Sequence, residues 1–140
     1  MKLASQFSAA ILALLWMISA SGLPAGAQSI DPQLESIRAA IIQAIGVQND
    51  TIDLKIAGKI FLVSRVNSNL NQANHTTRDG EASRIATVVA KALADNGRYK
   101  NIHTIRVLYV ATIKRGGHEK LVDSIDFRKD PSGVFLFHTT

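Results

Sequence analysis

The stretch "KIAGKIFLVSRVNS", residues 55–68, decides how this chain folds. Every second residue from Ile52 to Val66 is apolar or a Gly or Ser, which is the period of a β-strand with one face in water, and Phe61 and Val63 interrupt the polar face between them. A single strand from Ile52 to Val66 would exceed the usual length of about 3–10 residues. A tight turn costs least at a glycine. We therefore predict a hairpin folded near Gly58, with one continuous strand as the alternative.

The same alternation predicts a polar sheet face. If residues 52–66 form one extended strand, Lys55, Lys59 and Arg65 lie on the face opposite the apolar residues. Arg106 follows on a neighbouring strand. Cations in line on a sheet attract anionic ligands such as phospholipid headgroups. We predict an anion-binding or lipid-binding surface at these four residues, and an ordinary solvated sheet face is the alternative interpretation.

The first 27 residues have the pattern of an export signal. Lys2 gives a positive start, "AAILALLWMISA" (residues 9–20) is an uncharged apolar run, and Ala25-Gly26-Ala27 offers small residues to a signal peptidase. The apolar run is shorter than the roughly 20 residues that span a bilayer. We expect cleavage after Ala27, a single domain from residue 28 to 140 without a transmembrane span, and a periplasmic or secreted location.

Composition narrows the class of partner. The chain has 16 Lys and Arg against 11 Asp and Glu, a net charge of +5 that falls to +4 when Lys2 is removed. This mild excess favours anionic partners weakly. Nucleic acid is not expected, because basic residues are not interleaved with aromatic ones. The absence of Cys excludes disulfides, so the fold must depend on its apolar core.

The remaining segments predict two helices and a sheet. Residues 67–80 are polar and without periodicity, and we predict a loop there. "DPSG" at residues 130–133 is a reverse-turn signal. The predicted elements are helices over 32–45 and from 79 or 80 to about 94, and strands over 102–113, 120–129 and 134–140. The order predicts an α+β fold with two amphipathic helices packed on one face of a mainly antiparallel sheet.

The last strand raises the question of a partner. Phe135 and Phe137 alternate with Val134 and Leu136, so this strand is apolar on both faces. It is either a central strand covered on both sides, which we favour, or an edge that a partner completes. Phe135 and Phe137 are therefore the candidate partner edge, and a homo-oligomer joined through this strand is a third hypothesis for the function.

No motif in the sequence predicts catalysis. The four His lack the spacing of zinc ligands, and no nucleophile motif or phosphate loop is present. We predict no catalytic residues, no metal and no cofactor. The alternative is a small exported enzyme whose cleft would be lined by His103, His138, Asp123 and Asp126.

The middle of the chain resembles the BON domain, a small module of export compartments. Gly58 takes the place of the glycine in that family's hairpin, and Ile60, Leu62, Ser64 and Val66 follow at its alternating positions. The resemblance covers about residues 34–110, with Glu81 to Leu93 as second helix and "IHTIRVLYV" as last strand. It implies binding at an envelope membrane or to an envelope protein, without catalysis. The chain departs from the family at Ser64, where a small residue, often glycine, is usual.

Overall fold

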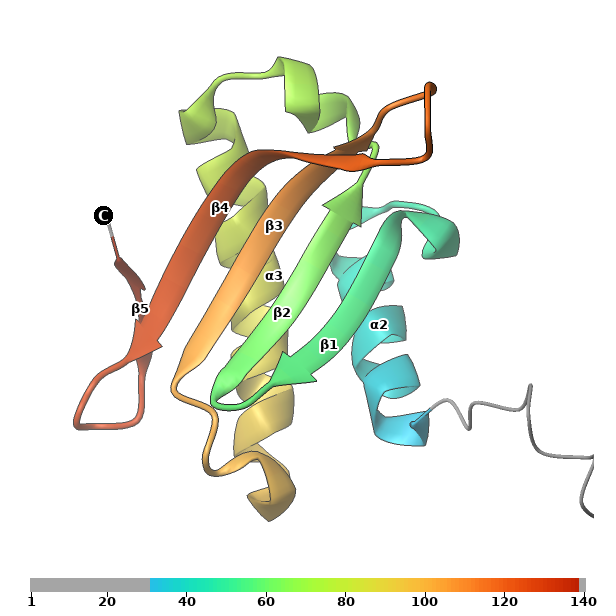
Figure 1. Ribbon diagram of the computed structural model, residues 1–140. Coiled ribbons are helices and arrows are strands. Elements are labelled where there is room, and N and C mark those ends of the chain that lie inside the picture. Colours follow the sequence, from blue (N-terminus) through green and yellow to red (C-terminus); the bar gives the residue numbers. More distant parts are fainter. Residues whose placement is uncertain (1–30, 139–140) are drawn as a thin grey trace, which may run out of the picture. The chain divides into compact units, whose positions relative to one another are not determined.

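The computed structural model describes residues 31–138, so the predicted signal segment lies outside the described residues. The elements follow the order helix, hairpin, helix and three strands (Figure 1). The helices are α2 (Pro32–Ile45) and α3 (His75–Ala94). The strands are β1 (Ile52–Ala57), β2 (Ile60–Val66), β3 (Thr104–Thr112), β4 (Glu119–Lys129) and β5 (Phe135–His138). Short 3-10 turns η1, η2 and η3 cover Asn49–Thr51, Asn69–Gln72 and Gly97–Tyr99.

The strands form one sheet in the order β1-β2-β3-β4-β5. β2 and β3 run parallel because α3 connects them, and every other neighbouring pair is antiparallel. The α+β class and the mainly antiparallel sheet are thus confirmed. β4 carries an irregularity opposite Tyr109 and Val110. In Figure 1 the top of β4 and its turn from β3 curl over the end of β2.

The hairpin at Gly58 is confirmed. Ala57 pairs with Ile60, which leaves Gly58 and Lys59 as a two-residue turn. Gly58 has φ +60°, a left-handed conformation that a glycine adopts without steric cost. Since Ala57 and Ile60 face each other across the ladder, their side chains lie on the same side of the sheet.

This pairing changes which positions are buried. Even-numbered residues such as Leu54 are buried in β1, whereas odd-numbered Phe61 and Val63 are buried in β2. Arg65 continues this odd series and is also buried. The prediction that Arg65 shares an exposed face with Lys55 and Lys59 is therefore wrong, because it assumed an unbroken extended chain.

The core combines side chains of the sheet and of both helices. Both helices lie behind the sheet in Figure 1. We call the sheet face that carries the buried residues the core side, and the opposite face the open side. The main core residues are Ile37 and Ile41 of α2, Ile85 and Val89 of α3, Phe61 and Val63 of β2, Ile105 and Val107 of β3, and Ile125 and Phe127 of β4.

The second helix begins earlier than the sequence indicates. Asn74 caps it by accepting a hydrogen bond from the Thr77 amide at 2.9 Å, so α3 starts at His75 instead of Asp79 or Gly80. The predicted loop of residues 67–80 is correspondingly shorter and contains η2. Asn67 opens it with φ +52° and bonds across to β3, its side-chain amide donating to Thr112 Oγ1 at 3.1 Å.

Candidate functional site

Exposed large apolar side chains lie at β5 and near the start of β4. Among residues 31–138, five large hydrophobic side chains are exposed, with relative accessibilities of 45–56 %. They are Ile113, Leu121, Val134, Leu136 and Phe137. One lies in the turn before β4, one in β4 and three in or next to β5. The last three, Val134, Leu136 and Phe137, lie together at one edge of the sheet, and we call these three the edge patch.

β5 is an edge strand. It pairs with β4 over four residues, from Phe135 opposite Lys129 to His138 opposite Asp126, and no other described strand lies beside it. Leu136 is 53 % and Phe137 is 45 % exposed. The prediction of a strand buried on both sides is wrong, because the sheet ends here. Whether a partner completes this edge, as the alternative supposes, remains a hypothesis.

A groove separates β5 from α3. Its volume is about 490 Å³, and on the helix side its walls are small residues. Phe137 packs edge-on against Phe127, with ring centroids 5.8 Å apart, and the Lys129 ammonium lies 5.2 Å from the ring of Phe135. The residues that line the groove include Ser83, Ala86, Thr87 and Ala90 of α3 and Phe127, Phe135 and Phe137 of the strands.

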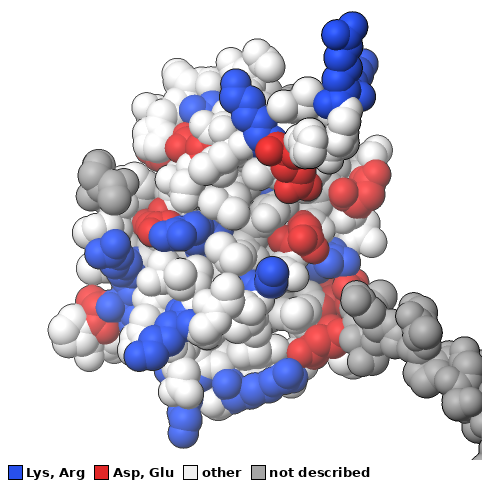
Figure 2. All heavy atoms as spheres, viewed as in Figure 1, with Lys and Arg blue, Asp and Glu red and all other residues white. Residues whose placement is uncertain are grey.

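The four predicted anion-binding residues do not form one surface. Lys55 and Lys59 are exposed at the hairpin. Arg106 lies on the open side but binds Asp126 with two hydrogen bonds of 2.7 and 2.8 Å, so its charge is neutralised. This contact holds the pKa of the Asp126 carboxyl below its ordinary value. Figure 2 shows Lys and Arg interspersed with Asp and Glu over this face, with Lys and Arg more frequent at its lower end.

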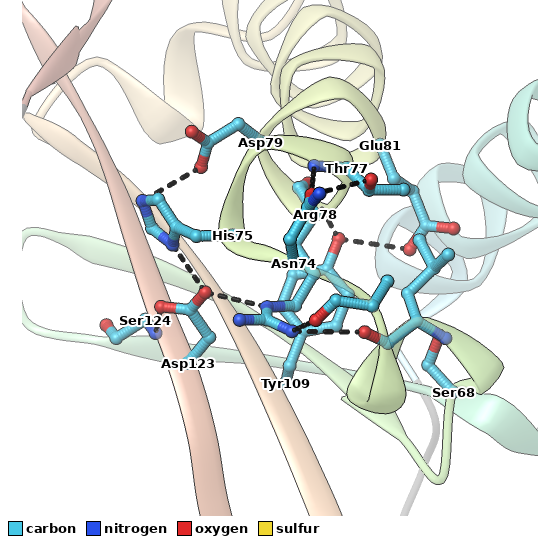
Figure 3. A network of polar contacts seen from close by, with 12 residues as sticks. Ser68, Asn74, His75, Thr77, Arg78, Asp79, Glu81, Tyr109, Asp123 and Ser124 are labelled. Carbon is cyan, nitrogen blue, oxygen red and sulfur yellow. Dashed lines mark hydrogen bonds and ion pairs between the residues drawn. The ribbon is translucent and has the colours of Figure 1, made fainter.

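Arg65 instead belongs to a buried network at the start of α3, of which Figure 3 shows Ser68, Glu81 and Tyr109. Its side chain is 2 % exposed, and Nε donates to Glu81 Oε1 at 2.8 Å. The same carboxylate oxygen lies 3.1 Å from the Tyr109 hydroxyl. Burial and the adjacent Glu81 raise the pKa of Tyr109. The remaining guanidinium nitrogens donate to the hydroxyls of Thr51 and Ser68, at 3.0 and 3.2 Å, so both charges are compensated.

A second cluster joins the same end of α3 to β4 (Figure 3). Asp123 Oδ2 accepts a hydrogen bond from Arg78 Nε at 2.7 Å and lies 2.6 Å from His75 Nδ1. The hydrogen bond to Asp123 raises the pKa of His75. Partial burial opposes ionisation of Asp123, but the hydrogen bonds from Arg78 and His75 outweigh it and lower the pKa of this carboxyl.

The contact between His75 and Asp123 is arranged to attach α3 to β4 more than to transfer a proton to a substrate. His75 Nε2 faces Asp79 Oδ1 at 3.3 Å, so both ring nitrogens are directed at carboxylates. A general base needs one nitrogen turned towards the proton that it removes. The sequence analysis missed the pair because His75 and Asp123 are separated by 48 positions and neither forms part of a short motif.

The structure brings together two of the four residues of the enzyme hypothesis, Asp126 and His138, and separates His103 from Asp123 along the length of β4. His103 precedes β3, where its amide donates to Lys59 O at 2.8 Å and its carbonyl accepts from the Lys129 amide at 2.9 Å. Asp123 lies six residues along β4 from Lys129, a distance of about 20 Å at 3.3 Å per residue. His138 faces Asp126 in the ladder. Across the described part of the chain, no three His, Cys, Asp or Glu side chains converge as metal ligands would.

Neither a scan against protein-family models nor a search of curated proteins finds a match for this chain. Among residues 31–138 neither helix is long and apolar enough to cross a membrane.

Proposed function

We propose that this protein is an exported, non-catalytic binding module of the cell envelope that recognises a protein partner through the edge patch. The observation that carries the proposal is that Val134, Leu136 and Phe137 are all exposed in or next to the edge strand β5. Apolar patches on otherwise polar surfaces commonly mark sites of protein interaction. We also take α2 and α3 to pack on the core side alone, which leaves the open side available to the same partner.

The order of the elements supports the resemblance to BON domains. A helix, a hairpin turning at a glycine, a second helix and a returning strand follow one another in α2, β1, β2, α3 and β3. The early start of α3 shortens the β2–α3 connection to residues 67–74. The resemblance to BON domains does not identify the partner, because one fold serves many functions.

Site-specific photo-crosslinking in the producing cell tests the proposal. A photoreactive residue replaces Leu136 or Phe137 in the patch, or Ala39 or Gln43 on the exposed surface of α2 as a matched control. We expect an adduct of defined mass from the patch positions and none from α2. Equal labelling at all four positions, or no adduct from the patch, would contradict the proposal. An adduct of twice the chain's mass would support the homo-oligomer hypothesis instead.

A second candidate function is binding to an anionic lipid surface through Lys55 and Lys59. The observation that favours it is that both lysines are exposed at the hairpin, at the end of the face where Lys and Arg are more frequent (Figure 2). Vesicle flotation with neutral and anionic lipid at low and physiological salt tests it. Binding to anionic vesicles alone, weakened by salt and by Lys55→Ala/Lys59→Ala, is expected. Equal flotation with neutral vesicles, or none, would contradict it.

A further inference from the structure

The edge of β5 can accept another strand. In an antiparallel pair every second residue of an edge strand points its N–H and C=O away from its neighbour. Folded proteins usually protect such edges with charged residues or proline. β5 consists of Phe, Leu, Phe and His, preceded by Val134, and has neither Lys, Arg, Asp, Glu nor Pro. Within the described chain, no segment covers this edge.

The groove next to β5 can take the side chains of an added strand. Phe135 and Phe137 face the core side, because they pair with Lys129 and with the buried Phe127. The α3 residues that face them are Ala, Ser and Thr, whose small side chains leave about 490 Å³ open. Alternate side chains of an extended segment fall on one face of a strand, so apolar residues at every second position would enter the groove.

The charges around the groove indicate which residues would alternate with the apolar ones in the partner. Lys129 lies against Phe135, and Arg84 and Lys91 are exposed on α3 next to the groove-lining Ser83 and Ala90. No acidic residue lines the groove. Asp130, in the β4–β5 turn, already accepts hydrogen bonds from Ser132 and Val134. A partner with carboxylates would therefore meet a cationic rim, whereas a second copy of this basic chain would bring the same charge to it.

We propose that an extended protein segment with alternating apolar and acidic residues adds to β5 as a sixth strand, with its apolar side chains in the α3–β5 groove. This inference rests on the proposed function, because it names the kind of partner that the edge patch would bind. The backbone edge would supply affinity, the groove would select side-chain size, and the cationic rim would select charge.

Three labelled, end-blocked peptides test the inference by fluorescence anisotropy with the purified protein. One alternates Val and Glu, the second alternates Val and Lys, and the third repeats the first with its backbone amides methylated. We expect the Val/Glu peptide to bind and the other two to bind at least about tenfold more weakly. Failure of the Val/Glu peptide to bind, or equal binding of the methylated peptide, would overturn the inference.

Matched variants locate the site. Phe137→Ala opens the groove wall, and Leu121→Ala removes an exposed apolar side chain of β4 that does not line the groove. Lys129→Glu reverses a charge at the rim of the groove. Lys120→Glu makes the same change at an exposed position of β4. We expect about tenfold weaker Val/Glu binding for the first member of each pair and little change for the second. Unchanged binding in both Phe137→Ala and Lys129→Glu, with folded spectra, would overturn the inference.

The outcomes separate this inference from the proposed function. If crosslinking from Leu136 captures a partner but no peptide binds, the protein-binding function stands and strand addition fails. If neither occurs, both fail. Light scattering over a concentration series adds the last distinction, because a dimer that dissociates on Leu136→Lys would identify a second copy as the occupant of the edge and overturn the acidic segment.

Discussion

Arg65 shows how strongly one residue can depend on the whole fold. Its guanidinium is enclosed by β2, η1, η2 and α3, and Glu81 supplies the compensating charge. Two buried charges stabilise a fold little when both are present, but removing one leaves the other without compensation. The main effect of the Arg65–Glu81 pair is therefore to fix where α3 begins to contact the sheet. Its contribution to the free energy of folding is small.

Replacing Arg65 by Met should destabilise the protein by about 3–5 kcal/mol, because Glu81 would stay buried without its partner. Chemical denaturation measures the change in the free energy of unfolding. The control is Arg38→Met, which removes the partly exposed ion pair with Glu35 and should cost about 1 kcal/mol or less. The double variant Arg65→Met/Glu81→Leu should be more stable than Arg65→Met alone. Similar losses for Arg65→Met and Arg38→Met would show that the charges are hydrated.

His75 should make stability depend on pH. Its pKa is raised in the folded state from an ordinary 6.5, so its contribution is fully present below 6.5 and is lost as pH rises through the raised value. The pKa of Asp123 is lowered from 3.8, so its contribution is present above 3.8 and is lost as pH falls through the lowered value. The contact between His75 and Asp123 therefore stabilises the fold most between pH 3.8 and pH 6.5, where both contributions are fully present.

Thermal unfolding of the wild type and of His75→Gln across pH measures this contribution. We expect the wild type to be the more stable protein at mildly acidic pH and the two melting curves to converge as pH rises past the raised His75 pKa. His118→Gln, in the turn between β3 and β4, is the control and should follow the wild-type profile. A His75→Gln difference that is constant at all pH values would indicate a packing effect without titration.

At the scale of elements, the β1–β2 turn determines which side chains are buried. Gly58→Ala should cost about 1 kcal/mol, because alanine adopts φ +60° with strain although no atom lies within 4 Å of the added methyl group. Gly80→Ala is the matched control, with equally open space but within the helix α3, and should stabilise by about 0.5–1 kcal/mol. Urea denaturation of both variants measures the two effects. Equal effects of the two substitutions would refute the argument from backbone conformation.

The sequence predicts the helices, strands and turns of this protein better than it predicts which face of a strand is buried. The α2 range, the hairpin and the turn at residues 130–133 could be found because glycine, proline and apolar periodicity act locally. The burial of Arg65 could not be found in this way, because a turn of two residues exchanges the faces of the following strand. A hairpin interpretation carried through to β2 would have placed Arg65 among Phe61 and Val63 on the core side.

The missed start of α3 has a related cause. Residues 75–80 are polar, and His75 and Arg78 among them bind Asp123 of β4, so hydrophobic periodicity begins only after them. The Asn74 cap was visible in the sequence, but "NHTTRDG" offers several polar residues of similar capping ability. Asp123, the partner of His75 and Arg78, lies on β4, and its proximity becomes evident only when the sheet is assembled.

At the scale of the whole molecule, the sheet order shows how far the core extends beyond residues 34–110, the segment that we propose to be BON-like. β4 pairs with β3 over most of its length and contributes Ile125 and Phe127 to the core. β5 pairs over four residues, and its side chains are half-buried or exposed. The first five main elements would therefore lack one wall of the core without β4, whereas the loss of β5 would leave that core intact.

Two truncations test this division. Ending the chain after Val110 removes β4, exposes the β3 edge and opens the core, so we expect no cooperative thermal transition and poor dispersion of amide proton shifts. Ending it after Asp130 removes only β5, so we expect a cooperative transition at a lower temperature, because Phe127 loses its contact with Phe137. If the shorter chain instead unfolds cooperatively, residues 34–110 form an independent module, and β4 and β5 would be additions to it. If loss of β5 alone abolishes folding, this strand is part of the core structure, and an edge available to a partner would have to be sought on β1.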